Sequence, residues 1–128
     1  MNWRIIVQLS LFGLLMAGLT IRVIPSNIEP FFWVPILAFS GFQVGRRAPS
    51  RPFVHGVLVG LANCVWVTSA HIIFLATYLQ NHAQEAEMMA SPSMSPRMMM
   101  LITGLGIGLI SGGVIGVLGL LTKKLLAR

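Results

Sequence analysis

Long apolar runs alternate along this chain with short polar connections. Four such runs predict α-helices over about residues 5–24, 28–45, 53–79 and 98–122, with one longer outer loop at residues 80–97. At a rise of about 1.5 Å per residue, the first run alone spans about 30 Å, the thickness of a bilayer's hydrocarbon core. The pattern therefore predicts an all-α integral membrane protein, a four-helix bundle whose antiparallel helices run up and down in turn.

Two of the runs allow a second interpretation. The first follows a basic start, as the apolar part of a signal peptide does, but it exceeds the usual ~7–15 residues and no small-x-small cleavage site follows. We therefore expect a retained helix. The second run has an uncharged core at residues 31–44 and contains Pro35, so a re-entrant segment is the alternative to a full span.

Composition favours a membrane environment. Hydrophobic residues make up 55% of the chain, charged residues only 9%, and the mean hydropathy is +0.82. A soluble domain carries about a quarter of its residues as charged ones, so this surface is not expected to face water for the most part. With 128 residues, the chain is expected to form a single transmembrane domain over residues 1–128.

Charged residues are sorted between the two sides of the predicted bundle. One side has seven basic residues and no acidic one: Arg4, Arg46, Arg47, Arg51, Lys123, Lys124 and Arg128. The other side has two basic and three acidic residues: Arg22, Arg97, Glu29, Glu85 and Glu87. Lysine and arginine stay in the cytoplasm during insertion, so we expect both termini to be cytoplasmic, in a bacterial inner membrane. The positive charge is then a topology signal, and no nucleic acid is expected as a partner.

Glycine recurs at every fourth position of the last run and forms a groove along one face: Gly104, Gly108, Gly112 and Gly116. The third run has a weaker matching series: Gly56, Gly60, Cys64 and Thr68. In lipid, small residues let helix backbones approach closely and gain van der Waals contact. We expect the third and fourth runs to pack on each other; a self-association face and a glycine-lined pore are the alternatives.

Three polar side chains that fall inside the third run are candidates for a site: Asn63, Thr68 and His71. An unpaired polar group in hydrocarbon is costly, so each should face protein or water. Interhelical hydrogen bonds are the simpler interpretation, and a substrate or ion site is the alternative. Proton-coupled transport usually needs an ionisable group at membrane depth, yet the chain has no Asp and its three Glu lie at the outer membrane ends.

Six of the eight methionines lie within residues 88–100. Thioethers are soft ligands suited to Cu(I), and an imidazole can join them, so a metal site would consist of Met88, Met89, Met94, Met98 and His82. Methionine is also an adaptable apolar residue for a segment that lies on lipid, which is the role we expect. The chain has no nucleophile–base–acid set, HExxH motif or phosphate loop, so we expect neither enzymatic activity nor a cofactor.

The segments HGVLVGLANCVW, NHAQEAEMM and GLISGGVIGVLGLLTKK resemble small four-helix bacterial membrane proteins whose role is uncharacterised. The resemblance implies a fold and a location, and no activity. We expect a non-catalytic accessory subunit or a self-associating bundle whose partners are the lipid bilayer and other membrane helices. A small transporter or channel, for example for a soft cation such as Cu(I), is the alternative.

Overall fold

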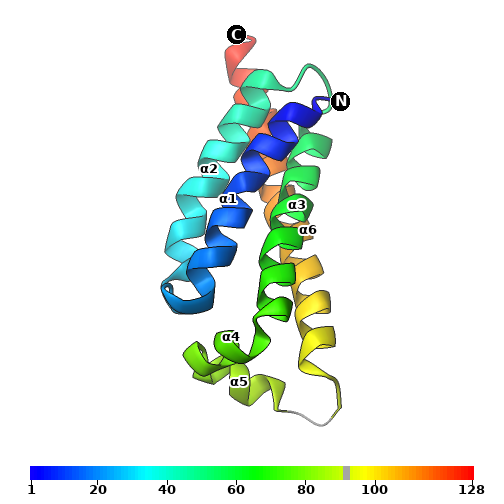
Figure 1. Cartoon of the computed structure of the whole chain (residues 1–128). Helices are drawn as coiled ribbons and strands as arrows, with labels where there is room; N and C mark the ends of the chain where they lie inside the picture. The colour runs from blue at the N-terminus through cyan, green and yellow to red at the C-terminus, as the bar shows by residue number, and fades with distance from the viewer. Residues whose placement is uncertain (91–92) are drawn as a thin grey trace.

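A computed structural model of the chain describes residues 1–90 and 93–128. That part is helical throughout, with six helices and no strand: α1 (Trp3–Arg22), α2 (Glu29–Arg47), α3 (Pro52–Ile73), α4 (Leu75–Asn81), α5 (Ala83–Met89) and α6 (Pro96–Leu126). The four long helices run alternately down and up beside one another, while α4 and α5 lie across one end (Figure 1). The all-α prediction therefore holds for the described residues.

Polar and proline residues define where the long helices begin. The Asn2 side chain accepts a hydrogen bond from the Ile5 amide before α1, and the Ser95 side chain accepts one from the Met98 amide before α6. Each cap satisfies an amide that has no partner inside its helix. Pro52 begins α3, where its missing N–H group costs no helical hydrogen bond.

The structure corrects the prediction of one helix over residues 53–79. The helix is interrupted at Phe74 (φ −102°, ψ 34°), so that α3 ends at Ile73 and α4 is a separate short helix. A single helix of that length would extend about 40 Å, longer than the hydrocarbon core. The interruption instead directs the rest of the segment across the end of the molecule (Figure 1).

The predicted outer loop at residues 80–97 is also corrected, because it contains α5. Its sequence AQEAEMM consists of good helix formers, a property that the reading of this segment as a loop overlooked. The last helix, predicted over residues 98–122, extends from Pro96 to Leu126, since its closing lysines suit the negative end of a helix dipole. The first two helices differ from the predicted 5–24 and 28–45 by one or two residues at each end.

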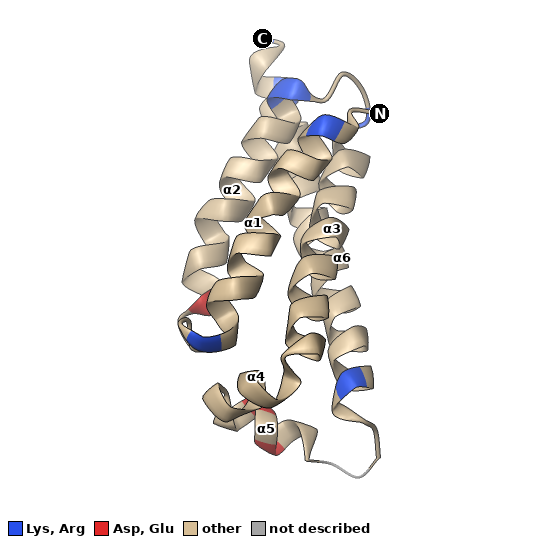
Figure 2. Ribbon diagram, in the orientation of Figure 1, with Lys and Arg blue, Asp and Glu red and all other residues tan. Residues whose placement is uncertain are grey.

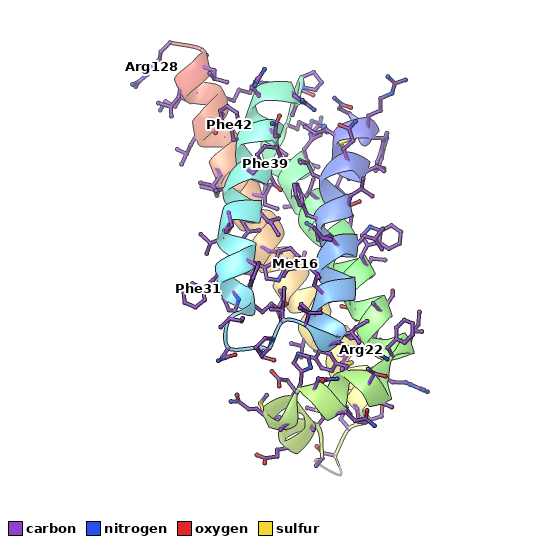
Figure 3. All side chains as sticks on the ribbon, turned by 60° about the vertical axis from the view of Figure 1, so that its left-hand side comes forward. Met16, Arg22, Phe31, Phe39, Phe42 and Arg128 are labelled. Atoms are coloured by element: carbon purple, nitrogen blue, oxygen red, sulfur yellow. The ribbon has the colours of Figure 1, made fainter. Side chains whose placement is uncertain are left out.

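Helix α3 packs on α1 and on α6, and α2 packs mainly on α6, whereas α1 and α2 touch each other only lightly. The apolar core lies in the half of the molecule that holds the chain ends, and it consists of Ile5, Ile6, Leu9, Val44, Ala48, Val59 and Ile115. Buried side chains such as Met16 point between the helices, while Phe31 of α2 points away from them (Figure 3).

Three helices, α1, α3 and α6, are long and apolar enough to cross a membrane. Helix α2 does not meet that criterion and is the shortest of the long helices, with 19 residues. The molecule exposes many large apolar side chains, among them Phe31 at 75%, Ile73 at 72% and Ile110 at 72%. An exterior of this kind suits lipid, since monomeric soluble proteins rarely expose large contiguous apolar patches.

Both chain ends and the connection between α2 and α3 lie at one end of the molecule (Figure 1). Most lysines and arginines lie at that end, whereas the glutamates lie at the other end together with Arg22 and Arg97 (Figure 2). The fold thus separates the charges along the direction of the long helices.

Candidate functional site

Three buried polar side chains of α3 make hydrogen bonds to the N-terminal part of the chain. His55 Nε2 accepts from the Asn2 amide at 2.9 Å, and Asn63 Oδ1 accepts from the Gly13 amide at 2.9 Å. Farther along, His71 Nε2 lies 2.8 Å from Thr20 Oγ1. We call these three contacts the α1–α3 polar seam, and they hold α1 against α3 from its first residue to its last turn.

The hydrogen-bond partners define how the histidines of the seam carry their protons. His55 Nε2 accepts a hydrogen bond, so its proton lies on Nδ1, which donates to the Arg51 carbonyl at 3.1 Å. The Thr20 hydroxyl donates to the Met16 carbonyl at 2.8 Å, so it accepts from His71 Nε2–H. Both ring nitrogens of His55 thus have a partner, and the ring is neutral because one of them accepts, whereas His71 donates through Nε2.

The two small-residue series of α3 and α6 face each other in a single antiparallel register. Helix α3 residues pair with α6 residues as Gly56 with Gly116, Gly60 with Gly112, Cys64 with Gly108, and Thr68 with Gly104. A Cβ on Gly56 or Gly60 would collide with the backbone of its partner, and a Cβ on Gly108 would lie 2.6 Å from Cys64 Cβ. The structure therefore brings together all six glycines singled out in the sequence, within one chain.

An aromatic stack closes the end of the molecule opposite the chain termini. The rings of His71 and Tyr78 lie 4.1 Å apart between centroids, and those of Tyr78 and His82 lie 4.0 Å apart. All three side chains are buried. The stack links α3 to α4 and, through Thr20, to α1, which explains why the chain folds back at Phe74.

Tyr78 and His82 differ in how their polar atoms are satisfied. His82 Nδ1 donates to the Tyr78 carbonyl at 2.8 Å, and its Nε2 is buried with no hydrogen-bond partner among the described residues. Burial raises the pKa of the Tyr78 phenol to about 12, and the negative charges of Glu85 and Glu29 add to the effect. Tyr78 therefore stays neutral across the physiological range.

Comparison with protein-family models, curated proteins and solved structures finds no match for this chain. The resemblance to small four-helix bacterial membrane proteins thus depends only on the three segments quoted above.

The methionines among the candidate soft-metal ligands come from α5, from the residues before α6 and from the start of α6. Met88 and Met89 lie on α5, Met94 precedes α6, and Met98 lies in its first turn. Met88, Met94 and Met98 are exposed, whereas His82 is buried in the aromatic stack. Among the described residues, no group of three or more His, Cys, Asp or Glu side chains is placed to hold a metal ion.

Sequence analysis missed Gly13, Thr20 and His55 of the polar seam and Tyr78 of the aromatic stack. Gly13 is needed because a Cβ there would lie 2.6 Å from Cα of Asn63. The glycine inside the first apolar run could have indicated a close helix contact, but the sequence does not show which residue of α3 faces it. That relation is set by the rotation of two helices and cannot be read from either run alone.

Proposed function

We propose that this protein is a non-catalytic multi-pass membrane protein of the bacterial inner membrane. Its four long helices cross the bilayer as a four-helix bundle, with both termini and the connection between α2 and α3 in the cytoplasm. The sorting of basic residues to that end supports this orientation, because lysine and arginine resist translocation. Helix α2 spans with the help of its packing on α6, which reduces its contact with lipid.

Within that membrane, the protein acts through helix packing, as an accessory subunit or a self-associating bundle. One observation carries this proposal: the buried polar and small residues of α3 are each engaged by a neighbouring helix of the same chain. His55, Asn63 and His71 bond to the α1 segment, and the glycines of α3 lie against the backbone of α6. These contacts favour a scaffold role over a ligand site for these groups.

The faces that remain for partners are the outer, apolar ones. On α6, Ile110 is 72% exposed, and added Cβ atoms on Gly106 and Gly113 would meet nothing within 4 Å. Such a face offers both apolar area and close backbone approach to another membrane helix.

Photo-crosslinking in native membranes tests this function. A diazirine amino acid at Ile110 is expected to give an adduct with a second polypeptide, whose mass distinguishes a second copy from a different subunit. The same group at Ile115, which is fully buried, should react only within the chain. Lipid adducts alone at Ile110, together with solute flux in liposomes that is lost in Asn63→Leu, would instead identify a transporter.

A further inference from the structure

The end of the molecule that carries the chain termini forms a surface we call the inner basic face. Figure 2 shows lysine and arginine gathered there and glutamate only at the other end. The face is defined by Arg4, Arg46, Arg47, Arg51, Lys123, Lys124 and Arg128.

Two of these side chains have contacts within the chain: Lys123 bonds to the connection between α2 and α3, and the guanidinium carbon of Arg46 lies 6.0 Å from the centroid of the Phe42 ring. Lys123 Nζ donates to the carbonyls of Ala48 at 3.2 Å and Pro49 at 2.8 Å, so it ties the connection between α2 and α3 to α6. The other six basic residues of the face are exposed. Because all three glutamates lie at the opposite end, no acidic side chain neutralises them.

The connection is held in a conformation that costs energy. Arg51 has φ 50° and ψ 55°, and it is the only non-glycine residue of the described part with positive φ. Its carbonyl accepts hydrogen bonds from the His55 amide at 3.2 Å and from His55 Nδ1 at 3.1 Å. Strained residues persist where the surroundings fix them, and they cluster at functional sites. The backbone of Arg51 is thus held at the start of α3 by its two hydrogen bonds from His55.

The exposed surface of α1 at the same end is a shallow, open depression, and Trp3, Arg4, Val7 and Gln8 of that one helix line it. Arg4 is exposed and carries a positive charge. Trp3 and Val7 are also exposed and provide an aromatic ring and an apolar surface. A phospholipid offers the matching sequence of a charged phosphate, a polar linkage and acyl carbons.

We propose that the inner basic face binds the phosphate groups of anionic phospholipids. The proposal rests on the membrane placement proposed above. Clusters of four to eight basic residues directly cytoplasmic of membrane helices attract anionic lipid, and the arginine fork binds phosphate through paired hydrogen bonds. Charge complementarity therefore selects an anionic headgroup over a zwitterionic one.

Native mass spectrometry of the purified full chain tests the lipid preference. Titration with phosphatidylglycerol and phosphatidylcholine of equal acyl length is expected to show at least about tenfold tighter binding of the anionic lipid, given roughly fivefold per basic residue at such a surface. The triple variant Arg46→Gln, Arg47→Gln, Arg51→Gln should lower this preference at least about fivefold, and raised salt should weaken it.

Two control variants test whether the lipid preference depends on charge at this face rather than on charge elsewhere, and whether any loss comes from misfolding. The variant Arg22→Gln, Arg97→Gln removes the two outer arginines and should keep the full preference. The variant Arg46→Lys, Arg47→Lys, Arg51→Lys keeps the charge and should retain most of it, which excludes misfolding as the cause of any loss.

Equal binding of both lipids by the wild-type protein would overturn the proposal. An equal loss of the preference for anionic lipid in the variant Arg22→Gln, Arg97→Gln would also overturn it. Competition by millimolar inorganic phosphate would identify a site for the free anion and overturn it as well. Alkaline carbonate extraction is the separate test of membrane placement: release of the chain contradicts the proposed function, whereas retention with no lipid preference contradicts only this inference.

Discussion

At the scale of single residues, polar and small side chains act in pairs across helix contacts. Asn63 reaches the Gly13 amide only because residue 13 lacks a side chain. His71 is satisfied by the Thr20 hydroxyl, which also bonds to its own helix. The residue types predicted that Asn63 and His71 would need partners, but the partners depend on helix rotation and could not be predicted from the chain.

Tyr78 is the only tyrosine, so its ionisation can be followed directly by the ultraviolet absorbance of tyrosinate. We expect a titration midpoint near 12 in the folded protein, because burial and the charges of Glu85 and Glu29 favour the neutral phenol. A folded-state pKa above the unfolded value of 10.0 means that the neutral ring stabilises the fold below pH 10. That contribution is lost as the pH rises through 12.

The variant Glu85→Gln removes one of the two negative charges. Its midpoint should fall below that of the wild type but stay above 10, since burial is the larger cause of the shift. A wild-type midpoint at 10 would show that the Tyr78 ring is not buried between the two histidines.

At the scale of helices, the apolar period and length of each run predicted the four long elements well. The length of an apolar run does not predict the break at Phe74, because a tertiary contact accompanies that break. It does not predict the short helix α5 either, because that helix depends on the local helix propensity of its residues. The aromatic stack of His71, Tyr78 and His82 forms only when the chain turns at Phe74. A run of apolar residues gives no sign of such a turn.

The glycine contact between α3 and α6 makes a sharp prediction at this scale. Gly60→Ala should lower the free energy of unfolding by about 2 kcal/mol or more, because the added methyl group collides with the Gly112 backbone. Gly106→Ala should leave it within about 1 kcal/mol of wild type, since nothing lies within 4 Å of that Cβ and alanine favours the helix. Unfolding in a denaturing detergent series measures both.

Equal effects of the two alanine variants would contradict the register described here. Gly113→Ala is a second control, because its Cβ also would meet nothing within 4 Å.

At the scale of the whole molecule, the position of the charges was predicted from the sequence and matches the two ends of the fold. The contact between α3 and α6 was predicted from their small-residue series, whereas the packing of α1 on α3 and of α2 on α6 was not. Four runs joined by connections are compatible with several arrangements, and only the fit of the glycine series, together with the polar seam, selects α3 as the partner of both α6 and α1.

The proposed orientation can be checked by cysteine labelling in a Cys64→Ser background, which keeps a donor for the Gly104 carbonyl. A membrane-impermeant maleimide should label Gln84→Cys in intact cells and Ser50→Cys only after permeabilisation, since the two residues lie at opposite ends. Labelling of both positions in intact cells would contradict cytoplasmic placement of the connection between α2 and α3.

Because α2 rests mainly on α6, the order of synthesis becomes a constraint on assembly. The ribosome completes α2 long before the final helix emerges, so the least apolar of the long helices spends that interval without its principal neighbour. If α2 crosses the membrane as proposed, the last helix completes its packing only after synthesis ends, and a chain truncated before α6 lacks the main contact of α2.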